Sequence, residues 1–566
     1  MKTTKNIARL AVTAGLTAAL SFGGVMAPVT MAFAEGMTTA NGSVTIANVE
    51  GNHTEFDGYQ IFKADVATVE GKTVVSNITW ANGSVKAAVE GVIKNEEPTY
   101  KGKTAQDAAD WITSKVTGTN DAYCVGPDNI AYKIAAAVDD LTDKKTTSAG
   151  VASGLEHGYW LFVTDAGTIG DGEAGTSPIF TVVGSTPVNV NEKTGIPTVE
   201  KKIVSDADDK EHDAADSQIG QDVTYNLYGT VAENFDKYDT YFYEFSDQIS
   251  KGLTLQTGAK IYLYKNRSDA KGDLTRAKGT DITAYFKEET PAEAAEDGSK
   301  TTTWTCDNLK KVSDVTKDSY IVVSYKAQIN KDAVVAGTEG NENAVTLNYS
   351  NNPMTSERGE TKPDTVKDYT YGLKINKVDL GTEAALDGAE FTIQATGADD
   401  GASKSLYVQK DGSLGSDPWK FVTANGGVIK VTGLDAGTYT VTEVSAPSGY
   451  AKVDPFTFEI KPSMNADDPG AGLTELTGVL TTGQNDKVIA GLTDGDSGDN
   501  KLTLKSGSEK TDGIFNITVG DTKQVGLPLT GLNGVTFTWI AGGAVLCIGV
   551  AHLIRSRKQA EESEQE

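Results

Sequence analysis

The sequence predicts an all-β protein in which several β-sandwich domains follow one another. Short segments rich in Val, Ile, Thr, Tyr and Phe recur along most of the chain, and many of them alternate apolar with polar residues, as half-buried strands do. The 60 glycines supply residues for the tight turns that join such strands. A length of 566 residues is enough for three or four domains of ordinary size.

Both ends of the chain carry apolar segments that stand apart from this β pattern. Near the N-terminus, basic residues precede an apolar run from Leu10 to about Val29, and Ala32-Phe33-Ala34 fits a small-x-small cleavage site. This order predicts a secretory signal peptide over residues 1–34. Residues 535–554 are apolar over about 20 positions, the length of a transmembrane helix, and the basic residues after them favour the cytoplasmic side. We therefore expect the region between the two segments to be exported.

The composition excludes several classes of function. A net charge of −27 argues against a nucleic-acid partner. Of the 3 cysteines, Cys547 falls in the predicted membrane span, while Cys124 and Cys306 fall in separate predicted domains, so we expect no disulfide framework. The 4 histidines are scattered without metal-ligand spacing, and no nucleotide-binding or hydrolase motif is present. We predict neither a cofactor nor a metal, and no enzyme.

The pattern of strands and breaks divides the exported region into three domains, which we place at residues 35–193, 197–363 and 370–524. The first combines strand segments with one helical stretch, residues 129–141, whose apolar residues recur at helical spacing. A Gly-Ile-Pro stretch separates the first domain from the second. The segment 361–367, which contains a proline and several charges, is predicted to be a second connector.

A pentapeptide lies directly before the predicted membrane span. Its residues are Leu527, Pro528, Leu529, Thr530 and Gly531. Together with the span and the basic tail, it resembles the LPXTG sorting signal of Gram-positive surface proteins. The resemblance implies that a sortase cysteine cleaves between Thr530 and Gly531 and passes the threonyl carbonyl to an amine.

The end of the first domain resembles the pilin motif of sortase-assembled backbone pilins. The segment reads Val-Asn-Val-Asn-Glu-Lys over residues 188–193, and Lys193 falls on the pilin lysine. Asn191 and Glu192 stand where that family usually has Tyr and Pro. The resemblance implies that Lys193 is the polymerisation nucleophile.

The second and third predicted domains resemble two further domains of this family. The second opens with V-x-K at Val199, contains F-x-D-x-x-x-x-G-L from Phe245, and closes with N-A-x-x-x-x-Y-S-N-N-P from Asn343, like the fimbrial isopeptide-forming domain. The third contains Y-x-V-x-E-x-x-A-P-x-G-Y over residues 439–450, like the E-box of the prealbumin-like, collagen-adhesin B-type domain. The resemblance implies tandem immunoglobulin-like and prealbumin-like β-sandwiches.

In such domains a lysine of the first strand bonds covalently to an asparagine or aspartate of the last strand, with help from a carboxylic acid. In the second domain, strand alternation places the three candidates among inward-facing residues. They are Lys201, Asn343 and the acid Asp247. We find no comparable set in the first domain.

In the third domain the E-box implies Glu443 as the acid. Asp521 shares a strand face with Phe515, Ile517 and Val519, so we choose it as the acceptor, with Asn516 as the alternative. The K-x-x-K-V-D spacing favours Lys374 as the nucleophile, and we follow it. Strand alternation instead favours Lys377, which shares a face with Leu373 and Ile375.

These resemblances imply a major (backbone) pilin, a structural subunit of a surface pilus that supports adhesion. Sortase would join Thr530 of one subunit to Lys193 of the next and finally attach the fibre to the cell wall of a Gram-positive bacterium. The implied partners are a pilin sortase, a housekeeping sortase, identical subunits, accessory pilins and peptidoglycan. The alternative is a pilus tip protein or a monomeric wall-anchored adhesin built from the same domains.

Overall fold

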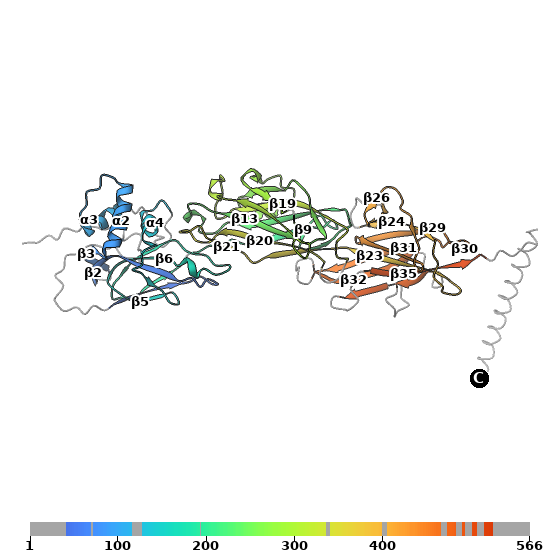
Figure 1. The fold of residues 1–566 in the computed structure, drawn as a ribbon, viewed down its shortest axis with the longest axis horizontal. Helices are drawn as coiled ribbons and strands as arrows, with labels where there is room; N and C mark the ends of the chain where they lie inside the picture. Colours follow the sequence, from blue (N-terminus) through green and yellow to red (C-terminus); the bar gives the residue numbers. More distant parts are fainter. Residues whose placement is uncertain are drawn as a thin grey trace, which may run out of the picture.

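The computed structural model describes three β-rich bodies that follow one another along the longest axis of the molecule (Figure 1). The described residues are 41–69, 72–115, 127–192, 194–291, 293–335, 340–398, 405–465, 472–482, 489–492, 501–505 and 514–524. The predicted signal peptide, Cys124, Lys193, the sorting pentapeptide and the predicted membrane span lie outside these residues. Within them, no helix is both long enough and apolar enough to cross a membrane.

The first body contains two sheets. A three-stranded sheet has the order β5-β1-β8, and a five-stranded sheet has the order β3-β2-β6-β7 with β4 beside β2. The strands are β1 (Gly42–Ala47), β2 (Phe56–Val69), β3 (Lys72–Trp80), β4 (Lys145–Thr146), β5 (Val151–Leu155), β6 (Gly158–Thr164), β7 (Ile179–Val183) and β8 (Val188–Asn191). A short 3-10 helix, η1, spans Ala166–Thr168.

Three helices of the first body pack on its larger sheet, on one side of β2 and β3 in Figure 1. They are α2 (Gly83–Glu96), α3 (Ala105–Lys115) and α4 (Ile130–Val138). The predicted helical stretch at 129–141 is confirmed as α4, and the Asn129 side chain caps it by accepting from the backbone N–H of Ala131. The sequence analysis did not predict α2 and α3, so this body is a sheet covered by helices rather than a pure sandwich.

The second body is a sandwich of two seven-stranded sheets. One has the order β10-β9-β12-β19-β15-β16 with β14 beside β19, and the other has the order β11-β22-β20-β13-β18-β17 with β21 beside β20. The first sheet comprises β9 (Val199–Val204), β10 (Glu211–His212), β12 (Asp222–Thr230), β14 (Leu253–Leu255), β15 (Lys260–Tyr264), β16 (Thr280–Asp281) and β19 (Tyr320–Ile329). The second comprises β11 (Ala214–Asp216), β13 (Tyr243–Ile249), β17 (Lys287–Glu289), β18 (Lys300–Cys306), β20 (Asn341–Ser350), β21 (Arg358–Glu360) and β22 (Asp364–Tyr369).

The connections of this body hold one short α-helix and three 3-10 helices: α5 (Arg267–Lys271), η2 (Phe235–Lys237), η3 (Thr283–Tyr285) and η4 (Leu309–Lys311). Strand β22 corrects the predicted connector at 361–367, because residues from Asp364 onward pair with β20 and β11. The β pattern was hidden there by Lys367 and Asp368, of which Asp368 is buried despite its charge.

The third body packs a five-stranded sheet on an eight-stranded sheet. The five-stranded sheet has the order β28-β23-β35-β30 with β33 beside β35, and the larger one has the order β26-β25-β24-β29-β31-β32-β34 with β27 beside β24. The first set is β23 (Tyr371–Asp379), β28 (Val428–Leu434), β30 (Tyr450–Ala451), β33 (Ile489–Leu492) and β35 (Ile514–Lys523). The second set is β24 (Glu390–Ala398), β25 (Tyr407–Val408), β26 (Leu414–Gly415), β27 (Phe421–Val422), β29 (Gly437–Ser445), β31 (Phe456–Met464), β32 (Leu473–Thr482) and β34 (Lys501–Lys505).

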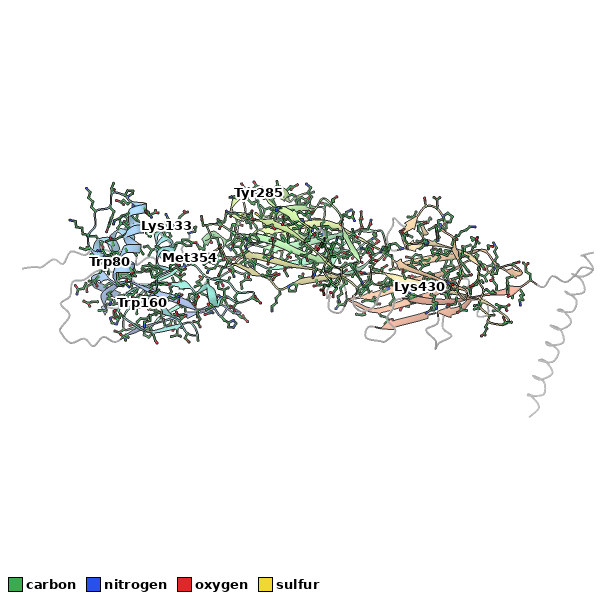
Figure 2. All side chains as sticks on the ribbon, in the orientation of Figure 1. Trp80, Lys133, Trp160, Tyr285, Met354 and Lys430 are labelled. Atoms are coloured by element: carbon green, nitrogen blue, oxygen red, sulfur yellow. The ribbon has the colours of Figure 1, made fainter. Side chains whose placement is uncertain are left out.

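The first and second bodies touch through the loop that follows β20. The Tyr132 hydroxyl of α4 donates to the backbone oxygen of Pro353, and the backbone N–H of Gly175 donates to the Asn351 oxygen at 2.6 Å. Met354 packs against the core of the first body and lies where the two bodies meet in Figure 2.

The second and third bodies are joined by the segment that contains and follows β11. Ala214 is part of the core of the third body, and the backbone N–H of Ile219 donates to the Gly433 oxygen at 2.9 Å. Gly433 has a left-handed backbone with φ +87°, and a Cβ built on it would lie 2.1 Å from Ile219 Cδ1. Only glycine therefore fits where Ile219 crosses the third body.

We expect Gly433→Ala to destabilise the third body by more than Gly449→Ala. Gly449 also has φ +87° but has no heavy atom within 4 Å of a built Cβ, so it isolates the cost of the left-handed backbone, about 1–2 kcal/mol. The additional cost at Gly433 measures the contact with Ile219. Calorimetric unfolding of the two variants tests this, and equal losses would show that Ile219 does not pack closely on Gly433.

Candidate functional site

A buried lysine lies at the centre of the second body. The side chain of Lys201 on β9 is fully buried, and its Nζ donates to Asp247 Oδ1 on β13 and to Asn343 Oδ1 on β20. Strand β9 belongs to one sheet of the sandwich, whereas β13 and β20 are neighbours in the other. The structure thus brings the three predicted residues together across the two sheets.

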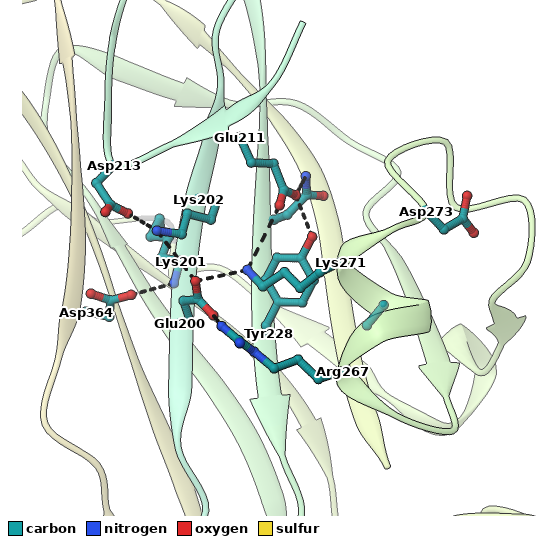
Figure 3. Close-up of polar contacts among 12 residues, drawn as sticks. Glu200, Lys201, Lys202, Glu211, Asp213, Tyr228, Arg267, Lys271, Asp273 and Asp364 are labelled. Carbon is teal, nitrogen blue, oxygen red and sulfur yellow. Dashed lines mark hydrogen bonds and ion pairs between the residues drawn. The ribbon is translucent and has the colours of Figure 1, made fainter. Parts of the chain in front are cut away.

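The neighbours of Lys201 on β9 explain why this lysine points inward. Glu200 and Lys202 face the opposite side of the strand, where Glu200 pairs with Lys271 at 3.0 Å and Lys202 with Asp213 at 2.5 Å (Figure 3). The backbone N–H of Lys201 itself donates to Asp364 Oδ2 at 2.6 Å. Because a shift by one residue would exchange the two faces, these outer ion pairs favour the register that buries Lys201.

Tyr325 on β19 is a fourth member of this cluster that the sequence analysis did not assign. Its hydroxyl donates to Asp247 Oδ2 at 2.6 Å and accepts from Asn343 Nδ2 at 2.7 Å and from Lys201 Nζ at 3.1 Å. The hydroxyl thereby uses its one donor and both of its acceptor positions. The alternation Ile321, Val323, Tyr325 placed this hydroxyl on the inner face and was the available signal.

Burial shifts the protonation of this cluster toward neutral groups. Removal from water lowers the pKa of Lys201 to about 8, although the attraction of Asp247 acts in the opposite direction. The same loss of hydration raises the pKa of Asp247 against the influence of Lys201 and Tyr325. An uncharged amine and a protonated carboxyl are the forms needed for nucleophilic attack on a carbonyl with acid assistance.

The third body has a second buried lysine, and it is Lys377 rather than Lys374. The Lys377 side chain is fully buried on β23, with Nζ close to Asp521 Oδ1 on β35 and 3.6 Å from Glu443 Oε1 on β29. Lys374 is only half-buried and faces the other side of β23, where it pairs with Asn516 of β35. The choice of Lys374 from motif spacing is wrong, because side chains alternate along a strand and Lys377 shares the face of Leu373 and Ile375.

The predicted acid and acceptor of the third body lie in the same core as Lys377. Burial raises the pKa of Glu443 to about 7, and its Oε2 accepts from the backbone N–H of Val453 at 2.8 Å. Asp521 raises the pKa of Glu443 further, whereas Lys377 lowers it. The Lys377 amine also lies 5.9 Å from the ring centre of Phe391. This group therefore resembles the first cluster in its chemistry: an amine, a side-chain carbonyl and an acid with a raised pKa.

Lys201 and Lys377 are more deeply buried than the other lysines that the structure describes. Lys201 and Lys377 each have 0% exposed surface, and no other described lysine is classed as buried. In the described part of the first body, the buried charged residues are all acids: Asp57, Glu173 and Glu192. The described residues of this body accordingly give no lysine-centred cluster.

Glu192 has a structural role that the sequence analysis did not predict. Its carboxyl is 2% exposed and accepts from Asn52 Nδ2 at 2.6 Å, from the Val49 backbone N–H at 2.9 Å and from the Thr54 hydroxyl at 3.1 Å. Its own N–H donates to the Ala47 oxygen at 2.9 Å, a bond that proline could not form. The residue directly before Lys193 is thereby tied to the loop after β1.

The burial of the Glu192 carboxyl also raises its pKa, although its hydrogen bonds act in the opposite direction.

The linker that follows residue 193 is packed against the second body. Gly195 lies against the backbone of Glu233, and Ile196 packs on the core of the second body. Lys193 itself lies outside the described residues.

Two family models match the chain. Residues 219–353 match the Gram-positive pilin backbone subunit 2, Cna-B-like domain, and residues 371–468 match the SpaA prealbumin-like fold domain. The matched regions lie in the two bodies that contain the buried lysines. The chain thus contains a pilin backbone domain followed by a prealbumin-like domain. No curated protein sequence matches it.

Several solved structures that match the chain are pilins. The T6 backbone pilin of Streptococcus pyogenes is 16% identical, with a TM-score of 0.49, and the match covers 86% of this chain and 99% of that one. The major pilin SpaD of Corynebacterium diphtheriae is 17% identical, with a TM-score of 0.44, covering 88% and 100%. The major pilin BcpA of Bacillus cereus is 14% identical, with a TM-score of 0.37, covering 86% and 99%.

We expect Lys377→Met to destabilise the third body by on the order of 3 kcal/mol, because it leaves Glu443 and Asp521 buried without their lysine partner. Lys374→Met is the matched control on the same strand and should cost less than about 0.5 kcal/mol, because that side chain is half-exposed. Calorimetric unfolding distinguishes the two. A larger loss for Lys374→Met would reverse the assignment of the buried lysine.

Proposed function

We propose that this chain is the backbone subunit of a sortase-assembled pilus on a Gram-positive cell surface. The observation on which the proposal depends is the match of residues 219–353 to the pilin backbone model, in a body whose buried lysine donates to both an asparagine and an acid. The prealbumin-like domain that follows repeats this combination of groups. The three proposed domains are residues 35–193, 197–363 and 370–524, and strand β22 (Asp364–Tyr369) extends the second of them.

In the proposed assembly step, a sortase cysteine attacks the Thr530 carbonyl and releases the amine of Gly531. The Lys193 amine of another subunit then attacks the thioester, which forms an amide and frees the cysteine. Repetition joins subunits head to tail without closing a ring, the arrangement that produces filaments. Glu192 supports this role for Lys193, because it fixes the chain directly before the lysine.

The final step of the proposed pathway attaches the fibre to the cell wall. A housekeeping sortase passes the Thr530 acyl group of the last subunit to peptidoglycan, and accessory pilins join the same fibre. Residues 535–554 hold the subunit in the membrane until its sorting signal is cleaved. The signal peptide at residues 1–34 directs export.

We further propose that both buried lysines form intramolecular isopeptide bonds without an external enzyme. In the second domain, Lys201 Nζ attacks the Asn343 side-chain carbonyl, and ammonia leaves. In the third, Lys377 Nζ attacks the Asp521 carboxyl, and water leaves. The protonated acids Asp247 and Glu443 would polarise the attacked carbonyls and transfer protons to the leaving groups.

The positions of these bonds suit a subunit under tension. Force enters at Lys193 and leaves at Thr530, so it passes through the second and third domains. In each domain the proposed bond joins a strand at the beginning of the domain to one near its end: β9 to β20, and β23 to β35. A cross-link that closes a loop of this length also stabilises by restricting the unfolded chain, by on the order of 4 kcal/mol.

The cross-links predict a mass deficit. Loss of one ammonia and one water should make the exported protein about 35 Da lighter than its sequence, as the acid-assisted mechanism requires. Glu443→Ala and Lys377→Ala should each restore about 18 Da beyond the change in side-chain mass, whereas Lys374→Ala should leave the deficit unchanged. Intact-mass spectrometry measures this, and a wild-type mass equal to the bare sequence would contradict both bonds.

The assembly proposal predicts a ladder of covalent polymers in cell-wall extracts on a denaturing gel. Lys193→Arg should abolish the ladder while single subunits still reach the wall, because wall attachment uses only the sorting signal. Lys202→Arg is the control and should keep the ladder. Deletion of residues 527–531 should remove both polymers and wall attachment.

Two outcomes would contradict this assembly proposal. A ladder that survives Lys193→Arg would move the linkage to another lysine. Wild-type protein that reaches the wall only as single subunits would instead favour a tip protein or a monomeric adhesin.

A further inference from the structure

Two buried carboxyls from different bodies converge where the second and third bodies meet. Asp216 of β11 accepts at Oδ2 from the backbone N–H of Ala436 at 3.1 Å. Asp435, in the turn between β28 and β29, accepts from the same N–H at Oδ1 at 2.8 Å. Asp216 is 6% exposed and Asp435 is 4% exposed. A single donor therefore holds two acidic side chains close together in a dry interface.

The surrounding hydrogen bonds show that this point closes the junction. Gln218 donates to the Gly412 oxygen and accepts from the Asp435 backbone N–H at 3.1 Å. The N–H of Ile219 donates to the Gly433 oxygen at 2.9 Å. The segment from Asp216 to Ile219 therefore binds to the third body through backbone groups of Gly412, Gly433 and Asp435, which surround the carboxyl pair.

Further acidic groups and a phenol face this pair. Asp206, from the loop after β9, acts on Asp435, Asp216 acts on Asp368 of β22, and both members of the pair act on the Tyr371 hydroxyl of β23. Burial, followed by Asp216 and Asp206, raises the pKa of Asp435 well above 3.8. Burial also raises the pKa of Asp368, and Asp216 adds to that shift.

We infer that the junction between the second and third bodies is a proton-dependent lock, closed while Asp216 and Asp435 share a proton and weakened when that proton leaves. With one proton present, one carboxyl donates to the other. Without it, two like charges face each other in an interface from which water is excluded. No chemical bond changes other than this hydrogen, which passes to the solvent.

The sign of the pH dependence follows from the raised pKa. The docked junction binds the proton more tightly than the separated segment, in which an aspartate has its ordinary pKa near 3.8. Docking is therefore most stable below that value and weakens as the pH rises through the pKa of the docked pair. The two bodies should form one rigid unit in acid and become more flexible toward alkaline pH.

Hydrogen exchange of the full chain, measured by mass spectrometry from about pH 5 to about pH 9 and corrected for the intrinsic exchange rates, tests the lock. The expected result is a loss of protection in peptides covering 217–221 and 433–437 that approaches tenfold per pH unit between 3.8 and the pKa of the docked pair and levels off above that pKa. Strand β19 of the second body is the internal reference and should stay protected. A junction whose protection does not change over this range would overturn the inference.

Variants separate the carboxyl pair from other effects of pH. Asp435→Asn and Asp216→Asn each supply a permanent amide donor in place of the shared proton, so either should give a junction that is protected at every pH. Asp411→Asn, an exposed acid beside Gly412 at the same junction, should keep the wild-type dependence. Loss of protection in β19 would show that a variant does not fold. In that case, the pH dependence of the other pair variant tests the inference. Wild-type pH dependence in a folded pair variant would overturn the inference.

Discussion

The energetic cost of burying an amine determines how the second and third bodies are organised. A lysine without water is stable only if an acceptor and a proton-donating group surround it, and both cores provide these at Lys201 and Lys377. Two aromatic rings also pack around the Lys201 amine. Tyr225 and Tyr325 stack with their ring centres 5.5 Å apart, and both ring centres lie within 6 Å of the amine. The low polarity that makes a buried lysine costly also lowers the pKa of Lys201, so packing and protonation have the same cause there.

The two clusters solve this problem with different geometries. In the second body Lys201 lies in one sheet of the sandwich and Asp247 and Asn343 lie in the other, so these polar contacts cross the core. In the third body the lysine and the acceptor lie on neighbouring parallel strands, β23 and β35, and only the acid comes from the other sheet. Two different strand topologies therefore bring chemically similar groups together. Such a cluster requires residues of the right type that point into the core, and it does not require one particular order of strands.

Strand alternation predicted most of the candidate site, and its failures have identifiable physical reasons. Lys201, Asp247 and Asn343 were assigned correctly to inner faces because each lies in a strand with clear alternation. In the third body, motif spacing overruled alternation and led to Lys374, although the two-residue period fixes the buried side as that of Lys377. Helix α3 and strand β22 were missed because charged residues obscured their periodicity. The contacts of Glu192 and the Asp216–Asp435 pair join segments that are 138 to 220 residues apart in the sequence. They could not be predicted, because no recognised motif connects those segments.

In each proposed cross-link the two joined residues are far apart in the sequence, and this separation affects how freely the surface of the domain can vary. Lys201 and Asn343 are 142 residues apart, and Lys377 and Asp521 are 144 apart. In the proposed cross-linked form, a pulling force takes the short path through each bond, and nearly the whole domain becomes a side loop that is not stretched. Surface loops within it would then carry no tension, so changes in their sequence would not weaken the fibre. A covalent bond in the core would in this way make the mechanical strength of the domain independent of the sequence of its surface.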